Sequence, residues 1–229
     1  FFAPYLSQLA TVRAYDPAHP SESAPLAEVA ACDVLVFAVP LASLDTLAAQ
    51  VAPLSLPHAR ILDVTSVKLR PLEILRAHFP QHQLLGTHPI FGPQSGKNGI
   101  EGLPLVLCND SWDEQSYAAL KSFLTDTLKL RVTEKTADQH DRDMAYVMGL
   151  SHLVGRTLST MNIPPLDTVT KSFAHLLELR SILQYDSWEL FETIQNGNPY
   201  VREIRAQFLA HINEIEAKLQ SPEAPPPAL

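Results

Sequence analysis

Residues 33–39 read D-V-L-V-F-A-V and are followed directly by Pro40. A short, nearly continuous apolar run that ends at a proline is typical of a strand buried on both faces of a parallel sheet. Residues 60–64, R-I-L-D-V, form a second run of this kind, and residues 43–52 between the two have helical character. The order strand, helix, strand predicts a parallel sheet with helices on both of its faces.

The beginning of the chain has the pattern of half a nucleotide-binding unit. A helix end at residues 2–9 precedes a predicted strand at residues 11–15, and this strand ends at Asp16. The first half of a Rossmann-type βαβ unit would carry a strand and a G-x-G-x-x-G turn, but no glycine precedes Gly86. Either the region is not a dinucleotide domain or the sequence begins inside its first helix. Phe1 is not a natural start residue, which favours the second interpretation.

The second half of the sequence changes character. Short strands are still predicted at residues 84–87 and 105–107, but from about Ala137 to about Leu219 only helical patterns remain. Apolar residues at spacings of three and four indicate a first long helix in this part, namely Met144, Val147, Met148, Val154 and Leu158. The predicted fold class is therefore α/β. A Rossmann-type, doubly wound parallel sheet without its first strand and Gly-rich turn is followed by an all-helical domain.

Three segments follow from this division. Residues 1–136 are predicted to form an incomplete dinucleotide-binding domain, and residues 137–220 a helical domain. Residues 221–229 contain four prolines in nine residues, which predicts a disordered tail.

Composition excludes several classes of protein. Apolar residues make up 46% and charged residues 18% of the chain, which is typical of a globular protein with a buried core. The net charge of −8 disfavours a nucleic-acid partner. Cys32 and Cys108 alone form neither a disulfide framework nor a zinc site, which favours a reducing, cytoplasmic location. The longest apolar run, residues 34–44, contains a proline and is too short to span a membrane, and no signal peptide is expected.

Chemistry-bearing residues concentrate in two stretches. Residues 63–68 read D-V-T-S-V-K, and residues 86–99 read G-T-H-P-I-F-G-P-Q-S-G-K-N-G. Both begin at the carboxyl ends of predicted parallel strands, where open α/β sheets bind their ligands. The alternative is an ordinary surface loop with an exposed His88. Because Ser66 ends the neighbouring strand and the loop is rich in glycine and polar residues, a ligand site is favoured.

These two stretches resemble the prephenate/arogenate dehydrogenase family of tyrosine biosynthesis. Residues 86–99 are particularly similar to the plant arogenate dehydrogenases. The likeness continues through residues 137–141 (A-D-Q-H-D), 151–156 (S-H-L-V-G-R) and 170–190, and so covers nearly all of the chain except the proline-rich tail. The H-P-I-F-G-P run preceded by S-V-K is specific, and the helical stretches support it.

The resemblance implies oxidative decarboxylation of a cyclohexadienol, with hydride leaving C4 for nicotinamide, a base taking the hydroxyl proton and CO2 leaving C1. His88 matches the catalytic histidine of the family, and an imidazole with an ordinary pKa near 6.5 suits this role. Ser66 matches a serine near the nicotinamide and the substrate hydroxyl. His152 matches a second active-site histidine, with a buried helix–helix contact as its alternative role. No metal is expected.

The cofactor is expected to be NAD, with NADP as the alternative. Asp16 ends a strand, where a carboxylate accepts hydrogen bonds from an adenosine ribose and repels a 2′-phosphate. This departs from the plant relatives, which use NADP, and the same aspartate could simply form a turn. Val39, Pro40 and Ser66 are the other predicted cofactor contacts, since they end two neighbouring strands.

The predicted substrate contacts are Gln94, Ser95 and Lys97 in the glycine-rich loop and Asp186 in the helical half. Asp186 matches a position where arogenate-specific plant enzymes carry aspartate and prephenate-using ones carry asparagine. Arogenate has an ammonium group where prephenate has a keto group, so a carboxylate favours arogenate. Its alternative role is to cap the helix that starts there.

The carboxylate anchor and the assembly are less defined. Leu176 stands where some bacterial relatives carry an anchoring arginine. The cations available in its place are Lys97, Arg156, Lys171 and Arg180. The resemblance implies a homodimer formed through the helical half. Two alternatives to this function stay open, namely another two-domain hydroxyacid-type dehydrogenase and a non-catalytic nucleotide-sensing module.

Overall fold

The computed structural model describes residues 1–221. The chain divides into two compact units, Phe1–Asp141 and Arg142–Leu229. The sequence-based boundary after residue 136 falls where helix α6 (Ala137–Met144) begins, and this helix contributes residues to both units. The tail predicted to be disordered lies outside the described residues, apart from Ser221.

The first unit is built on a five-stranded sheet in the order β1-β2-β3-β4-β5. Its strands are β1 (Val34–Phe37), β2 (Arg60–Asp63), β3 (Gln83–Pro89), β4 (Pro104–Asn109) and β5 (Arg131–Glu134). The predicted α/β class is confirmed, and β1, β2 and β3 are parallel. However, β4 pairs antiparallel to β3, and β5 runs parallel to β4. The expectation of a wholly parallel sheet is wrong there, because residues 90–103 contain no crossover helix that would carry the chain back.

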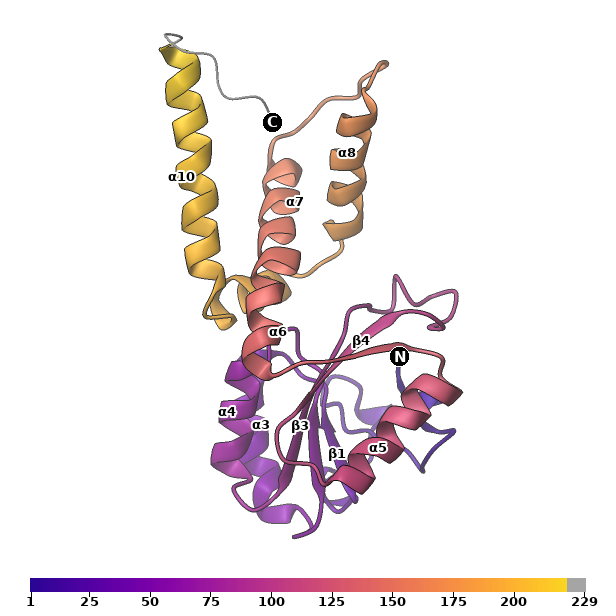
Figure 1. Cartoon of the computed structure of the whole chain (residues 1–229). Coiled ribbons are helices and arrows are strands. Elements are labelled where there is room, and N and C mark those ends of the chain that lie inside the picture. Colours follow the sequence, from indigo (N-terminus) through magenta and orange to yellow (C-terminus); the bar gives the residue numbers. More distant parts are fainter. Residues whose placement is uncertain (222–229) are drawn as a thin grey trace. The chain divides into compact units, whose positions relative to one another are not determined.

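Helices cover both faces of this sheet (Figure 1). Those of the first unit are α1 (Ala3–Leu6), η1 (Pro20–Glu22), α2 (Leu26–Ala30), α3 (Leu41–Val51), η2 (Ala52–Leu54), α4 (Leu69–His78), α5 (Glu114–Ser122) and η3 (Phe123–Thr127). On one face, Ile61 and Leu84 pack with α3 and α4. On the other, Leu62 and Leu85 pack with Trp112 beside α5. This alternation of neighbouring residues between faces is what a strand with two covered faces requires.

Two details of the predicted sheet are wrong at its β1 edge. Residues 11–15 form no strand, and the backbone there is joined instead to Ala24, whose N–H donates to the carbonyl of Ala14. Val34 and Val36 were expected to be buried but are each 43% exposed, whereas Leu35 and Phe37 are buried. The physical reason is that β1 is the edge strand of the described sheet, and the helix on that face covers β2 and β3.

The regular secondary structure in the described part of the second unit is all helical, as predicted. After the end of α6 come η4 (Ala145–Leu150), α7 (Ser151–Thr160), α8 (Lys171–Leu183), α9 (Trp188–Glu192), η5 (Thr193–Gly197) and α10 (Val201–Gln220). The predicted first long helix is confirmed as α6, η4 and α7 in succession, with a π-helical turn in η4. Such widened turns often occur at functional sites.

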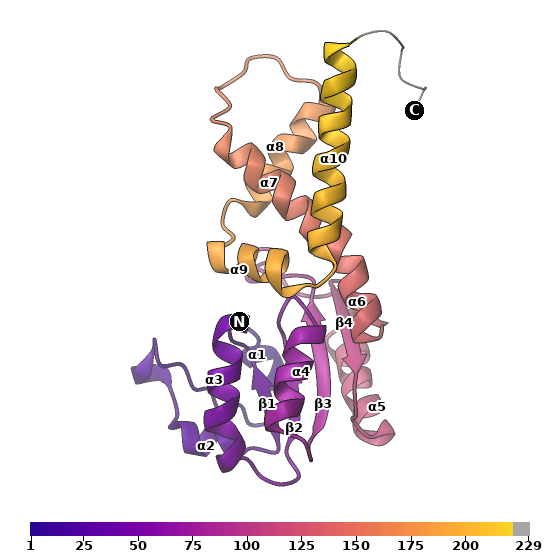
Figure 2. The ribbon, with the colours of Figure 1, turned by 90° about the vertical axis from the view of Figure 1, so that its left-hand side faces the viewer.

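Helices α7 and α8 pack against each other (Figure 2), and Gly155 of α7 lies next to Leu183 of α8. A Cβ atom at Gly155 would lie 2.5 Å from Cδ1 of Leu183, so a larger residue there would require this leucine side chain to move. Within residues 1–221, every helix is too short or too polar to cross a membrane.

Candidate active site

The predicted residues of the first unit gather at one edge of the sheet. His88 lies inside β3, near its carboxyl end, and is only 3% exposed, so it is not the loop histidine that the sequence indicated. Ser66 is half-buried in the turn after the neighbouring strand β2, and Val39 and Pro40 follow β1. Since β1, β2 and β3 are parallel neighbours, all four residues lie at the carboxyl edge, where such sheets bind ligands.

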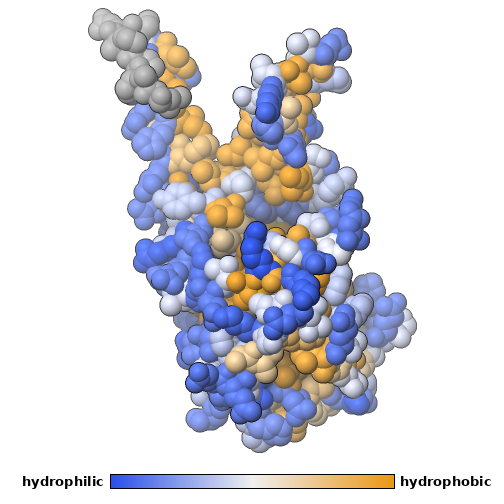
Figure 3. Space-filling model, turned by 45° about the vertical axis from the view of Figure 1, so that its right-hand side comes forward, coloured by the Kyte–Doolittle hydropathy of each residue, from blue (hydrophilic) through white to orange (hydrophobic). Residues whose placement is uncertain are grey.

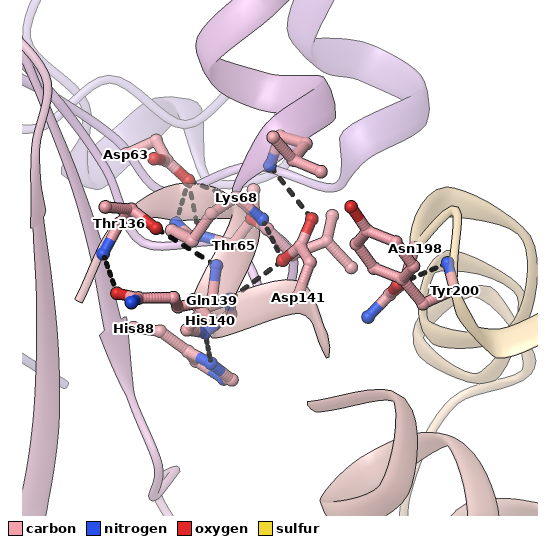
Figure 4. A network of polar contacts seen from close by, with 12 residues as sticks. Asp63, Thr65, Lys68, His88, Thr136, Gln139, His140, Asp141, Asn198 and Tyr200 are labelled. Carbon is pink, nitrogen blue, oxygen red and sulfur yellow. Dashed lines mark hydrogen bonds and ion pairs between the residues drawn. The ribbon is translucent and has the colours of Figure 1, made fainter. Parts of the chain in front are cut away.

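A buried ion pair connects strands β2 and β3 near this edge. Lys68 and Asp63 are both fully buried, and Nζ of Lys68 donates to Oδ1 of Asp63 at 2.5 Å and to the carbonyl of Thr87 at 2.7 Å (Figure 4). The lysine thereby joins the end of β2 to the residue before His88. Gly86 leaves room for the lysine stem, since a Cβ there would lie 2.9 Å from its Cδ atom.

A chain of buried side chains leads away from His88 (Figure 4). Its Nδ1 lies 2.8 Å from Nε2 of His140, and Nδ1 of His140 lies 2.8 Å from Oδ1 of Asp141. Both partners belong to α6 and are fully buried. The sequence analysis did not select them as site residues. The only signal was the adjacent His-Asp pair at the start of the helical half, and nothing local indicated that it contacts β3.

The environment of His88 keeps its imidazole neutral. Burial lowers the pKa of His88 well below its ordinary value of 6.5, and electrostatic interactions with His140 and Lys68 act in the same direction. Both effects disfavour the protonated form. A neutral imidazole at the carboxyl edge of a sheet is able to accept a proton at physiological pH.

The glycine-rich loop after β3 presents its predicted ligand-binding residues to solvent. Gln94 and Lys97 are exposed. Ser95 is exposed too, but its hydroxyl accepts a hydrogen bond from the N–H of Gly92 at 3.0 Å and so closes the turn. Phe91 anchors the loop in the core of the unit. The loop is thus fixed at its base while Gln94 and Lys97 stay available for a ligand.

Asp16 is exposed and forms a turn. Its Oδ1 accepts a hydrogen bond from the N–H of Ala18 at 2.9 Å, which confirms the turn-forming role considered for it. Within residues 1–221, its second carboxylate oxygen takes part in no hydrogen bond, so that oxygen is available to a ligand hydroxyl.

His152 and Asp186 form a pair within the second unit. Nδ1 of His152 lies 3.4 Å from Oδ2 of Asp186, and their side chains are 9% and 27% exposed. The capping role considered for Asp186 is wrong, because the hydroxyl of Ser187 accepts the hydrogen bond from the N–H of Leu190 that caps α9. Burial lowers the pKa of His152, and Arg156 adds to this, whereas the carboxylate of Asp186 opposes it.

Arg156 holds the segment that carries Asp186. Its guanidinium donates to the backbone carbonyl of Asp186 at 2.9 Å and lies 5.7 Å from the ring centroid of Trp188 and 5.3 Å from that of Phe191. These contacts fix the start of α9. Arg156 is therefore engaged in the fold, which weakens its candidacy as the anchor of a substrate carboxylate.

Metal and thiol chemistry receive no support from the described residues. Among residues 1–221, no group of three or more His, Cys, Asp or Glu side chains is arranged to hold a metal ion. Cys32 and Cys108 are both free. Burial raises the pKa of Cys108 to about 12, so its thiol stays protonated.

Comparisons with known proteins agree with this architecture. The family model for the prephenate dehydrogenase nucleotide-binding domain matches residues 10–133. A second model, for the TYRAAT1-like C-terminal domain, matches residues 157–225. Together the two models cover most of both compact units.

Individual relatives point the same way. Arogenate dehydrogenase 1 of Arabidopsis thaliana is 30% identical over 176 residues, which are 72% of this chain and 28% of the relative. Arogenate dehydrogenase 2 of the same plant is 32% identical over 145 residues, covering 60% of this chain and 40% of the relative. The chain thus spans less than half the length of these two curated relatives.

A solved structure shares the fold. Prephenate dehydrogenase from Aquifex aeolicus, in complex with hydroxyphenyl propionate and NAD+, superposes with a TM-score of 0.72 at 18% identity. The match covers 95% of this chain and 85% of that one. The matched nucleotide-binding model spans more than half of the sequence, and the chain therefore belongs to the prephenate/arogenate dehydrogenase family.

Proposed function

We propose that the protein catalyses the nicotinamide-dependent oxidative decarboxylation of arogenate or prephenate, with His88 as the base. The observation that carries the proposal is a buried imidazole with a lowered pKa at the carboxyl edge of the sheet, one strand away from Ser66. Family membership supplies the reaction class, since the Arabidopsis relatives are named arogenate dehydrogenases and the Aquifex structure is a complex with NAD+.

The residues at the sheet edge fit part of a dinucleotide. Val39, which is half-buried, and Pro40 follow β1, and Ser66 follows the neighbouring β2. Asp16 lies outside the described strands, and its unused carboxylate oxygen can accept a hydrogen bond from a ribose. When bound, the oxidised nicotinamide supplies the hydride acceptor. Because the charge of Asp16 would repel a 2′-phosphate, we propose NAD as the preferred cofactor over NADP.

The protein's own part in the reaction is to move one proton. In the proposed reaction His88 takes the proton from the C4 hydroxyl of the substrate while C4 loses its hydrogen as hydride. The ring then loses its C1 carboxylate as CO2, and the electron pair of the broken C–C bond completes the aromatic ring. The phenolate oxygen at C4 takes the proton back from His88, so that the imidazole ends neutral. Ser66 would hold the hydroxyl toward His88.

The test is a cofactor-reduction assay on the protein expressed from its natural gene, with arogenate and prephenate each combined with NAD and NADP. We expect reduction with release of CO2, fastest with arogenate and NAD. Reduction with simple hydroxy acids alone would support the other dehydrogenase class. Cofactor binding without turnover of any substrate would support a sensing module, and either result would refute the proposal.

We propose that Asp186 selects arogenate through its ammonium group. The Asp186→Asn variant should lower the ratio of kcat/KM for arogenate to that for prephenate by about 10-fold or more, because a charge-assisted hydrogen bond contributes about 1.5–3 kcal/mol. Steady-state kinetics on both substrates measures the ratio. Glu189→Gln, which removes an exposed carboxylate from the neighbouring α9, is the matched control and should leave it unchanged. An unaltered ratio in Asp186→Asn would assign substrate choice to another residue.

We also propose that the protein is a homodimer formed through its second unit. Large apolar side chains are exposed along the helices there, and apolar surface of this kind is visible in Figure 3. They include Leu176, Ile182, Leu209, Ile212 and Ile215. Sedimentation equilibrium should give the mass of two chains, and a single-chain mass at micromolar concentration would contradict this.

A further inference from the structure

His88 is one end of a buried relay of three side chains. The relay is defined here as His88, His140 and Asp141, with exposed fractions of 3%, 0% and 0%. Two contacts of 2.8 Å connect them: Nδ1 of His88 to Nε2 of His140, and Nδ1 of His140 to Oδ1 of Asp141. His140 lies between the other two members (Figure 4). His140 and Asp141 are adjacent in the sequence, whereas His88 lies 52 positions before His140.

Asp141 is held rigidly at the far end of the relay. Its Oδ1 accepts a hydrogen bond from the backbone N–H of Lys68 at 2.8 Å, and its Oδ2 accepts one from the N–H of Leu69 at 2.9 Å. These two N–H groups are at the start of α4, whose N-cap residue offers no side-chain hydrogen bond of its own. Because both of its oxygens accept from backbone donors at a helix N-terminus, the carboxyl group of Asp141 acts as the acceptor at this end of the relay.

An acceptor at this end fixes where the protons lie along the relay. Since Asp141 only accepts, the short contact requires a hydrogen on Nδ1 of His140. When His140 is neutral, its Nε2 carries a lone pair and accepts from Nδ1–H of His88, whereas a protonated His140 would donate to Nδ1 of His88 instead. With His88 neutral as well, its Nε2 is left without a hydrogen. Within the described part of the chain, that Nε2 forms no hydrogen bond, so its lone pair is free.

We propose that His140 and Asp141 are positioning residues that hold His88 in the Nδ1–H tautomer, with Nε2 as the nitrogen that accepts the substrate proton. The proposal deepens the proposed function and rests on His88 acting as the base. In the opposite tautomer Nε2 already carries a hydrogen, so this nitrogen could not accept the substrate proton. When Nε2 gains the proton, the existing Nδ1–H bond to His140 and the hydrogen bond from His140 to Asp141 stabilise the imidazolium. An aspartate orients the imidazole of the serine-protease triad by the same logic.

The tautomer can be measured without any activity. Imidazole ¹⁵N chemical shifts of the protein, assigned by comparison with His88→Gln and His140→Leu, should show His88 protonated at Nδ1 and bare at Nε2. In His140→Leu the acceptor for Nδ1–H is gone, and His88 should shift toward the Nε2–H form. A wild-type His88 with its hydrogen on Nε2, or a doubly protonated His140, would overturn the proposal.

Kinetics give the second measurement. His140→Leu should lower kcat by about 100-fold with KM changed by less than about 3-fold, since a misplaced tautomer impairs proton transfer and leaves substrate contacts intact. His140→Gln places an amide oxygen near the position of Nε2, so it can still accept from His88. It should recover at least about 10-fold of the lost kcat. Asp141 is not the residue to vary first, because its removal would also uncap α4.

The outcomes separate this inference from the proposed function. If the wild-type protein turns over neither substrate, the proposed function fails, while the ¹⁵N shifts still decide the tautomer. If the wild type is active and His88→Gln is not, but His140→Leu keeps wild-type kcat, then the relay has no role and the function stands. Equal losses in His140→Leu and His140→Gln with an unchanged His88 tautomer would also reject the relay, since they indicate a packing role for His140.

Discussion

Replacing His88 by glutamine should lower kcat by on the order of 10²–10⁴-fold, the contribution of a positioned general base. Glutamine has a similar length and can accept a hydrogen bond, but it cannot hold a proton at neutral pH. We therefore expect KM to change little, because the loss concerns the proton-transfer step. Steady-state cofactor reduction with saturating arogenate measures the effect. His58→Gln, at an exposed histidine of the same unit, is the matched control and should retain full activity.

The pH profile adds a readout that a folding defect would not produce. Burial lowers the pKa of His88 well below 6.5, so the base stays neutral and competent when the pH falls through 6.5. We expect kcat/KM of the wild type to stay level there and to fall only at a lower pH, where His88 becomes protonated. His88→Gln should lack this acidic limb. A limb centred at or above pH 6.5, or one retained in the variant, would assign the titration to another group.

Removing the buried ammonium of Lys68 should have the largest effect on stability. The Lys68→Met variant leaves the carboxylate of Asp63 buried without its cation, and breaking a buried pair in this way costs about 3–5 kcal/mol. Oδ2 of Asp63 already lacks a hydrogen-bond partner within the described residues, so hydrogen bonds to this oxygen do not compensate for the loss of the lysine. Urea unfolding followed by circular dichroism measures the loss in the free energy of unfolding.

Two further variants show whether the effect is electrostatic. Arg70→Met removes an exposed cation from α4, the helix that Lys68 directly precedes, and exposed pairs contribute at most about 1 kcal/mol. In the double variant Lys68→Met/Asp63→Asn no charge is left uncompensated, so it should be less destabilised than the sum of the two single variants. A loss below about 1 kcal/mol in Lys68→Met would mean that Asp63 is protonated or reached by water.

The sequence was sufficient for the parts of the fold that depend on local pattern. The apolar runs at residues 33–39 and 60–64 contain β1 and β2, because short apolar runs are typical of neighbouring parallel strands. The helical half follows from its apolar spacing. Ser66 and His88 were placed at the same edge because both come at the ends of parallel strands, and the structure confirms this placement.

Other features could not be read from local pattern because they depend on partners distant in the chain. The reversal of β4 leaves no mark on its own residues, since antiparallel and parallel strands use similar apolar sequences. The exposure of Val34 and Val36 depends on which helix covers their face. A helix cap was the alternative role for Asp186, and only the observed hydrogen bond of Ser187 removed it.

The linear pattern of residues thus established the architecture and named the imidazole on which the proposed chemistry depends, since hydrophobic periodicity and short motifs act over a few positions. The tertiary structure added the surroundings of that imidazole. His140 reaches it across 52 positions, and the carbonyl that Lys68 binds lies 19 positions along the chain. The basicity and orientation of a buried group are set by the charges and acceptors around it in space, and folding alone brings those together.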